Sequence, residues 1–322
     1  MKRLLVILSI VLIMTACKEN DPDIHKTWAE RLGFPRGSRV LILHADDVGM
    51  NHEANTAAQS LLENERIQSA AAMVPCPAFE EFTNWILNNP EVDLGLHLTL
   101  TSEWSTYRWS TVADSVPGLL DEDGFMWHEV ADVVQHASAD EVEKEIRAQI
   151  ENAVSYGIQP GHLDTHMGTL YGRAEFAERF LKVAEEYDIP ALVIEFTSEI
   201  LDRLRSDGIN IPDDVVDITA EYSLPKVDDF YAVPYGATYK EKKQNFIDLV
   251  QSLKPGITEI IFHPNHDSSL LRQITVHWQQ RIWETDMFHD TEIIQFLANE
   301  DILFTDWKDI MARFRSINRT DQ

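Results

Sequence analysis

The sequence predicts an α/β fold in which parallel strands and outer helices form one barrel-like domain, similar to a TIM barrel and either regular or distorted to seven strands. Short apolar runs alternate with amphipathic helical patterns over most of the chain, which is typical of βα units. At 322 residues the chain is long enough for one such barrel or for two smaller domains. Its hydrophobic content of 44% excludes a wholly disordered protein, and no internal repeat is visible.

The expected elements begin at residue 39. The apolar run 39–44 is too short for a helix and indicates a buried strand. Similar runs predict the other strands, at 69–74, 92–98, 161–165, 190–195, 230–233, 258–263 and 301–304. Between them, apolar residues at helical spacing predict helices at 53–64, 79–87, 139–156, 174–186, 240–253 and 279–298.

The interval 101–129 breaks this alternation, because it has no clear periodicity. It contains Trp104, Trp109 and Trp127, together with turn-forming glycine and proline. An aperiodic segment of this length in a compact domain is typical of a lid or a binding loop. The tryptophans offer flat apolar faces on which a ligand could stack. Ordinary packing of the loop against the rim of the barrel is the alternative.

The N-terminus is predicted to be a targeting segment. Lys2 and Arg3 precede an apolar stretch, and small residues stand directly before Cys17, which resembles the lipobox of bacterial lipoproteins. This pattern predicts a signal peptide at 1–16, lipidation of Cys17, and a membrane-anchored location in the bacterial envelope, on the periplasmic or the surface side. An uncleaved anchor helix is the alternative. Residues 17–37 are then expected to form a tether and 38–318 the folded domain.

The charge balance limits the partners. Lys and Arg number 27 against 54 acidic residues, so the formal net charge is −27. Such a surface repels nucleic acid and anionic membranes, and contact with a membrane is expected only through the lipid anchor. The sequence does not indicate an oligomeric state.

Asp46 and Asp47 follow the first strand directly. Burial of two adjacent carboxylates is costly, and each opposes the ionisation of the other, so the pair favours a cation or a shared proton. One reading is a metal on one Asp and general-base work for the other. The other reading is a helix cap and a turn.

Three further strands also end in titratable groups. His97 ends the strand 92–98, His162, Asp164 and His166 alternate at 161–166, and His263 ends the strand 258–263. Sites in parallel α/β folds lie at the carboxyl ends of the strands. Four such ends in one chain predict a metal site.

The residue types define the chemistry of that site. One carboxylate and two imidazoles leave coordination positions open for water and substrate. Oxygen and nitrogen ligands together suit Zn²⁺ best, and Mg²⁺, Mn²⁺, Co²⁺, Ni²⁺ or Fe²⁺ are alternatives. A nearby carboxylate and a histidine could move protons during hydrolysis of an amide or an ester.

These segments resemble the YdjC/ChbG-type carbohydrate deacetylases, which are relatives of the polysaccharide deacetylases. The resemblance depends on HADDVG at 44–49, LGLHLTL at 94–100, HLDTH at 162–166 and FHP at 262–264, with a further local pattern at 115–125. The matching segments span nearly the whole expected domain in the right order.

The resemblance implies roles for particular residues. Asp47, His97 and His166 would bind the metal, and Asp46 would be the general base. His263 would be the acid, or the electrostatic partner, on the departing amine. Apart from the resemblance, we expect His162 and Asp164 to orient His166 from behind, because a ligating imidazole needs an acceptor for its other ring nitrogen. For His162, ordinary hydrogen bonding at the strand end is the alternative. Arg281 and Glu284 could hold the site from behind, or form an ordinary surface pair.

The chain also departs from the family pattern. Gly168 stands where a further His is common, and 191–195 lacks an Arg that is often present. The sequence therefore predicts a metal-dependent hydrolase that deacetylates an N-acetylated sugar. A sugar-binding lipoprotein without catalysis and a metal-dependent carbohydrate esterase are the alternatives.

Overall fold

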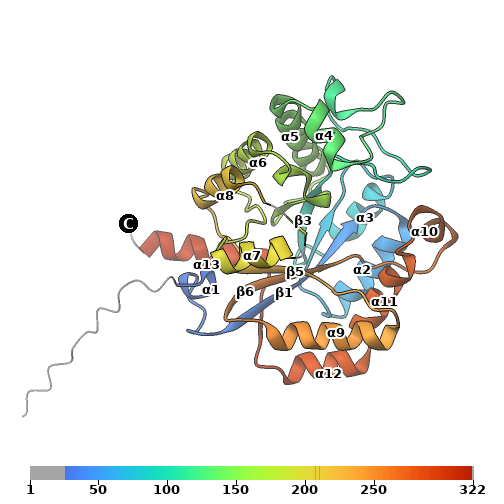
Figure 1. Cartoon of the computed structure of the whole chain (residues 1–322). Coiled ribbons are helices and arrows are strands. Elements are labelled where there is room, and N and C mark those ends of the chain that lie inside the picture. Colours follow the sequence, from blue (N-terminus) through green and yellow to red (C-terminus); the bar gives the residue numbers. More distant parts are fainter. Residues whose placement is uncertain (1–25, 207, 210, 321–322) are drawn as a thin grey trace, which may run out of the picture.

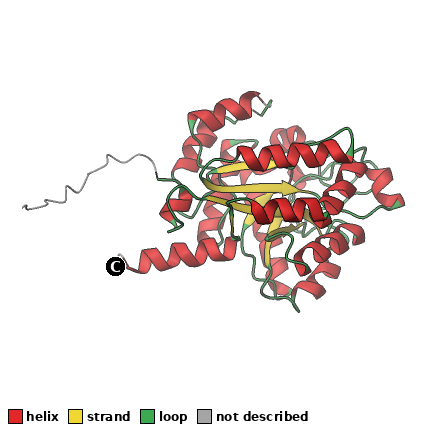
Figure 2. Cartoon of the chain, turned by 90° about the horizontal axis from the view of Figure 1, so that it is seen from below, coloured by secondary structure: helices red, strands yellow, loops and turns green. Residues whose placement is uncertain are grey.

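The computed structural model describes residues 26–206, 208–209 and 211–320. It contains a sheet of parallel strands surrounded by helices (Figures 1 and 2). The strands are β1 (Arg39–Val48), β2 (Ser69–Ala72), β3 (Asp93–Leu98), β4 (Leu163–Thr165), β5 (Asp229–Ala232), β6 (Gly256–Phe262) and β7 (Leu303–Phe304). The predicted α/β class with parallel strands is confirmed.

The order of the strands is β4-β3-β2-β1-β6-β5, and β7 pairs with β1 beside β2. β1 is central and long, and it is buried from Val40 to Val48. The pairing of β1 with β6 runs without a shift from Arg39 opposite Gly256 to Ala45 opposite Phe262. This register places the ends of β1 and β6 side by side.

The predicted strand 190–195 is present only as two isolated bridges, Leu163 with Ala191 and Ile194 with Val227. These bridges connect β4 to the segment that leads into β5, where the N–H of Asp228 donates to the carbonyl of Ile257 in β6. The sheet is therefore a distorted barrel whose last side is joined by single bridges rather than by a regular strand.

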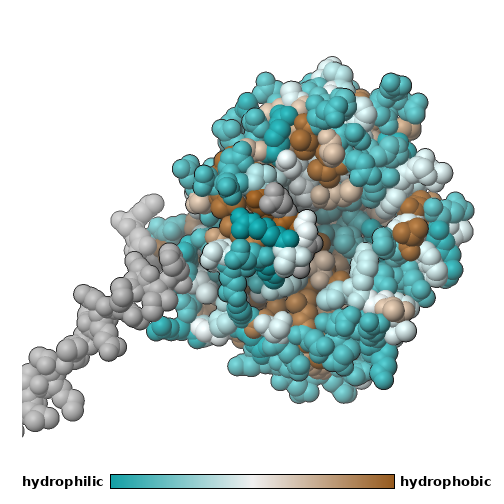
Figure 3. Space-filling view, viewed as in Figure 1, coloured by the Kyte–Doolittle hydropathy of each residue, from teal (hydrophilic) through white to brown (hydrophobic). Residues whose placement is uncertain are grey.

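The helices form the outer layer. They are α1 (Trp28–Arg31), α2 (His52–Glu63), α3 (Phe79–Ile86), α4 (Val130–His136), α5 (Ala139–Ser155), α6 (Ala174–Tyr187), α7 (Ser198–Ser206), α8 (Asp213–Ala220), α9 (Tyr239–Ser252), α10 (Ser269–Ile274), α11 (Trp278–His289), α12 (Thr291–Asn299) and α13 (Trp307–Thr320). Short 3-10 helices lie at η1 (Pro117–Leu119) and η2 (His166–Tyr171). On the face shown in Figure 3, most of the surface is hydrophilic and hydrophobic residues form small separate patches.

The predicted helix 279–298 is two helices, α11 and α12. Asp290 separates them, because its side chain accepts a hydrogen bond from the N–H of Glu292 and so caps the second helix. The start of α5 follows its sequence signal, since Ser138 and Glu141 form a capping box.

The predicted tether, 17–37, differs from the structure at its C-terminal end. Trp28, Leu32 and Phe34 are buried in a cluster with Trp307 and Ile310 of α13, so this part of the chain belongs to the folded unit. The predicted signal peptide and Cys17 lie outside the described residues. Within the described ranges, no helix has both the length and the apolar character needed to cross a membrane.

Candidate active site

The carboxyl ends of β1, β3, β4 and β6 carry the side chains that the sequence singled out. Asp46 and Asp47 lie near the end of β1, His97 in β3, His166 directly after β4, and His263 directly after β6. Because the strands are parallel, these ends meet at one end of the barrel.

The structure brings Asp47, His97 and His166 together. Asp47 Oδ1 lies 3.5 Å from His97 Nε2 and 3.4 Å from His166 Nδ1, and the two histidine nitrogens are 3.2 Å apart. All three side chains are buried, with 1%, 4% and 5% of their residues' surface exposed.

Left-handed backbone conformations place two of these side chains. Asp47 has φ 60°, and Gly49 (φ 85°) follows it before α2 begins. Met167 has φ 54°, directly after His166. Non-glycine residues adopt this region at a cost of about 1 kcal/mol or more, and such strain is common at functional sites. The alternative reading of Asp47 as the cap of α2 does not apply, since Asn51 caps that helix.

Each of the three side chains is also held from its far side. His97 Nδ1 donates to Asp164 Oδ1 at 2.6 Å, and His166 Nε2 donates to Glu103 Oε2 at 3.1 Å. Arg281 Nη1 donates to Asp47 Oδ2 at 2.7 Å. The outer atoms are therefore engaged, and one atom of each side chain remains facing the other two.

The charges in the cluster shift its pKa values strongly. Burial alone would raise the pKa of Asp47, yet Arg281 and the neighbouring histidines hold it well below its usual range. Burial opposes protonation of His166, but Glu103 and Asp47 raise its pKa to about 10. A cation bound by His166 must therefore displace a proton, since only the neutral imidazole is a ligand.

The three facing atoms fit a divalent cation. Ligands about 2.1 Å from a tetrahedral ion are roughly 3.4 Å apart, close to the three distances observed here. Asp47 Oδ1 is buried with no hydrogen-bond partner among the described residues, which is the state expected of an atom that requires an ion. This group can hold a metal ion.

Asp46 and His263 lie next to this group. His263 Nε2 is 3.9 Å from Asp46 Oδ2, and the His263 side chain is 33% exposed against 5% for Asp46. The N–H of His263 donates to Glu284, which in turn accepts from the buried Lys242. His263 therefore stands on the solvent side of Asp46, and its backbone is fixed by an ion pair behind it.

The remaining predicted residues have other surroundings. Trp104 and Trp109 are buried in a cluster with Met50 and Met73, and Trp109 Nε1 donates to the carbonyl of Thr101. Trp127 donates to the carbonyl of Gly118 and stacks on His136. These contacts pack the loop against the domain, and stacking of the tryptophans on a sugar stays a prediction.

The prediction that His162 and Asp164 orient His166 is wrong, because Asp164 binds His97 and the partner of His166 is Glu103. The sequence did not indicate Glu103. It is one acid in an aperiodic aromatic segment, and nothing local in the sequence marks it as a partner of His166. Arg281 was considered, and the structure pairs it with Asp47 across the site while Glu284 binds Lys242. Gly168 adopts φ 66°, and an added Cβ there would meet no atom within 4 Å.

A separate cleft of about 750 Å³ lies at the opposite end of the barrel. Its lining includes Leu94, Gly161, Pro190 and Lys308, which stand at or before the starts of strands or in the last helix. It contains none of the side chains described above, so it is not the site of their chemistry.

The fold and the site together define a class, an α/β barrel protein with a buried Asp-His-His group at the carboxyl ends of its strands. Residues 40–299 match the family model described as YdjC-like protein. A carbohydrate deacetylase of Thermus thermophilus is 33% identical over 238 residues, which cover 73% of this chain and 80% of that relative. The chain belongs to the YdjC-like family, and the resemblance drawn from the motifs is confirmed.

A second relative agrees with this assignment, and a solved structure shares the fold. A carbohydrate deacetylase of Thermoanaerobacter pseudethanolicus is 25% identical over 269 residues, 84% of this chain and 98% of the relative. The crystal structure of a candidate cellobiose-phosphate cleavage protein of Enterococcus faecalis superposes with a TM-score of 0.69 at 21% identity, covering 85% of this chain and 99% of that one. The second comparison shows that the fold is shared.

Proposed function

We propose that this protein is a metal-dependent carbohydrate deacetylase that removes acetyl groups from N-acetylated sugars. The observation that carries the proposal is the group of Asp47, His97 and His166, whose facing atoms are 3.2–3.5 Å apart while their other atoms are fixed. The names of the relatives in the same family supply the substrate class.

When bound, a divalent cation would supply a water molecule of lowered pKa and a positive charge toward the amide oxygen. Asp46 would accept the proton of the attacking water, because its carboxylate lies beside the group and is almost fully buried. His263 would deliver a proton to the departing amine, since it is the exposed member of the pair. Arg281 keeps Asp47 ionised and oriented.

Substitution Asp46→Asn tests this assignment. It removes the base and leaves Asp47, His97 and His166 intact, so acetate release from N-acetylglucosamine oligomers should fall by about 10²–10⁴-fold with metal content unchanged. His52→Gln, at an exposed residue on α2, is the matched control and should keep full turnover. Near-normal turnover of Asp46→Asn would show that the base is another group.

The substrate comparison separates the alternatives. Faster release from O-acetylated than from N-acetylated sugars would identify an esterase. Glycan binding without acetate release under any divalent metal would identify a non-catalytic binding protein, which Gly168 and the missing Arg in 191–195 make worth testing.

We also propose that Cys17 is lipidated and anchors the protein to a bacterial membrane. The support is the sequence pattern alone, a short basic start, an apolar stretch and small residues before the cysteine. Cys17→Ser should move the protein from the membrane fraction to the soluble fraction and abolish incorporation of labelled fatty acid. Unchanged fractionation and labelling would exclude this anchor.

A further inference from the structure

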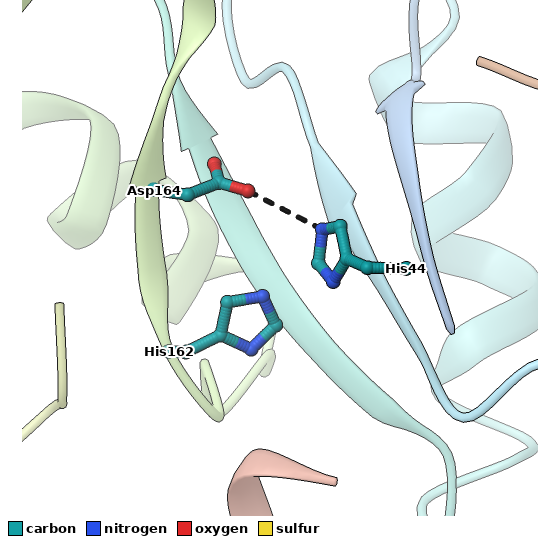
Figure 4. Close-up of side chains that lie close together, drawn as sticks. All are labelled: His44, His162 and Asp164. Atoms are coloured by element: carbon teal, nitrogen blue, oxygen red, sulfur yellow. Dashed lines mark ion pairs between the residues drawn. The ribbon is translucent and has the colours of Figure 1, made fainter. Parts of the chain in front are cut away.

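A second buried cluster lies in the interior of the barrel, behind the group of Asp47, His97 and His166. It consists of His44 on β1, His162 just before β4, and Asp164 on β4 (Figure 4). Their residues are 0%, 0% and 2% exposed. The mechanism above uses only one atom of this cluster, Asp164 Oδ1, which orients His97.

The other polar atoms of the three side chains have no hydrogen-bond partner among the described residues. These atoms are both ring nitrogens of His44, both ring nitrogens of His162, and Asp164 Oδ2. One donor atom from each residue lies within 4.8 Å of the others, and His44 Nε2 is 3.3 Å from Asp164 Oδ2. In Figure 4 a ring nitrogen of His44 and one of His162 face the gap beside Asp164. Buried polar atoms rarely remain unsatisfied, so this convergence requires a ligand, a proton or water.

The fold holds His162 in place. Its ring packs between β3 and Trp307, whose ring is nearly parallel to it with centroids 5.6 Å apart. On the other side is Gly95, where an added Cβ would lie 2.2 Å from His162 Nε2. Glycine is therefore required at 95 for this position of the imidazole.

The surroundings are rich in carboxyl groups. Asp46 Oδ1 lies 3.2 Å from His44 Nε2, and Asp93 Oδ2 lies 3.6 Å from His162 Nδ1. Glu259, fully buried on β6, has an oxygen without a partner among the described residues and acts electrostatically on both histidines. With Asp164, four carboxyl groups therefore surround two imidazoles. Buried carboxylates without a counter-charge cost several kcal/mol, so the cluster favours a positive charge, either a metal ion or a proton on an imidazole.

We propose that His44, His162 and Asp164 form a second, interior site for a divalent cation of the zinc class. Two imidazole nitrogens and one carboxylate oxygen are the donor set that zinc accepts. A cation there would be structural, because the site is closed to solvent and its donors are not positioned to bind substrate. It would also fix Asp164, whose other oxygen orients His97. The inference does not rest on the proposed reaction.

Metal stoichiometry tests the second site. The full chain, loaded with zinc and freed of unbound metal, should retain about two zinc ions per chain by elemental analysis and native mass spectrometry. Brief treatment with a chelator should remove the ion of the Asp47 group first and leave about one ion, because the interior site is buried. A wild-type chain that retains a single ion, lost completely to the chelator, would overturn the proposal.

Variants assign each ion to its site. His162→Phe keeps the stacked ring and removes both nitrogens, so it should lose the chelator-resistant ion alone, and Gly95→Ala should do the same by displacing the ring. His166→Asn should lose only the labile ion, and His52→Gln should keep both. Retention of the resistant ion by folded His162→Phe would show that it is bound elsewhere. If ordered waters or a proton on His44 satisfy the cluster instead of a metal ion, every variant of the cluster will have the same metal content as the wild type. That result would also overturn the proposal. Failure of the deacetylase assay would leave this count unaffected.

Discussion

Glu103 connects the aperiodic segment 101–129 to the candidate metal group through one hydrogen bond. Its carboxylate accepts from His166 Nε2 at 3.1 Å, which fixes the ring so that Nδ1 faces Asp47 and His97. Burial alone would raise the pKa of Glu103, but His166 holds it below its usual range. A partner of this kind orients a metal ligand and raises its basicity.

A matched pair of substitutions measures this contribution. Glu103→Ala removes the acceptor, so the affinity for zinc should fall by roughly 10–100-fold, whereas Glu103→Gln retains a carbonyl oxygen and should lose less. Competition with a chelating dye measures both affinities. Equal affinity of the alanine variant and the wild type would show that Glu103 does not support the ligand.

The site residues that stand at the ends of strands could be predicted from the sequence. The residues that reach the site only through tertiary packing could not. Asp47, His97 and His166 follow from the placement of titratable groups at the carboxyl ends of parallel strands. Glu103 comes from a segment without periodicity, and Arg281 from a helix of low amphipathic contrast whose orientation no local pattern fixes. Local sequence therefore predicted the candidate ligands and a role for Asp164 behind them, left Arg281 as one of two readings, and did not indicate Glu103.

The segment 101–129 is ordered by contacts with α5 rather than by structure of its own. Glu145 of α5 is fully buried and accepts hydrogen bonds from the N–H groups of Val112 and Ala113. Gln149, one turn later, binds both backbone groups of Thr99, just before this segment. The packing that places Glu103 therefore depends on two polar side chains of one helix.

Glu145 makes the stability of this element depend on pH. Burial raises its pKa from the ordinary 4.5 to about 7, although the backbone donors oppose the shift. Because the pKa of Glu145 is higher in the folded state, the protonated side chain stabilises the fold. This contribution is full below pH 4.5 and is lost as the pH rises through 7. The change amounts to about 3 kcal/mol. Denaturant titration of the metal-free protein measures the free energy of unfolding. Between pH 5 and pH 8 this free energy should fall in the wild type relative to Glu145→Gln, which cannot ionise at this position. Parallel pH curves for the two proteins would contradict the assignment.

Strands and helices could likewise be predicted where the local sequence pattern determines them, and not where tertiary packing does. Seven of the eight predicted strands are present, because buried apolar runs are a strong local signal. The exception, 190–195, is apolar but forms only two isolated bridges, Leu163 with Ala191 and Ile194 with Val227. The short helix α1 was missed because a four-residue helix has no detectable period, and it exists by packing against β6 and α13.

At the scale of the whole molecule, the two ends of the barrel have separate tasks. The carboxyl ends of the strands carry the ionisable groups of the candidate site. At the other end, α1 covers the start of the barrel, where the N–H groups of Trp28 and Ala29 donate to Asp228 and the indole of Trp28 donates to Glu195. The same carboxylate of Asp228 accepts from Ile257 in β6. One partly buried acid, directly before β5, therefore links the first helix to β6.

This separation predicts that stability and catalysis respond independently to changes at the two ends. Trp28 is 8% exposed and contacts a cluster that includes Trp307 and Ile310, so Trp28→Ala should lower the free energy of unfolding by about 3–5 kcal/mol. Because no side chain of α1 reaches the carboxyl ends of the strands, kcat/KM for acetate release should stay unchanged well below the melting temperature. Denaturant titration and steady-state kinetics measure the two quantities, with Lys26→Ala, at an exposed neighbour, as the control. A fall in kcat/KM of the folded Trp28→Ala protein, with the control unaffected, would show that packing at the closed end of the barrel is transmitted along β1 and β6 to Asp46, Asp47 and His263.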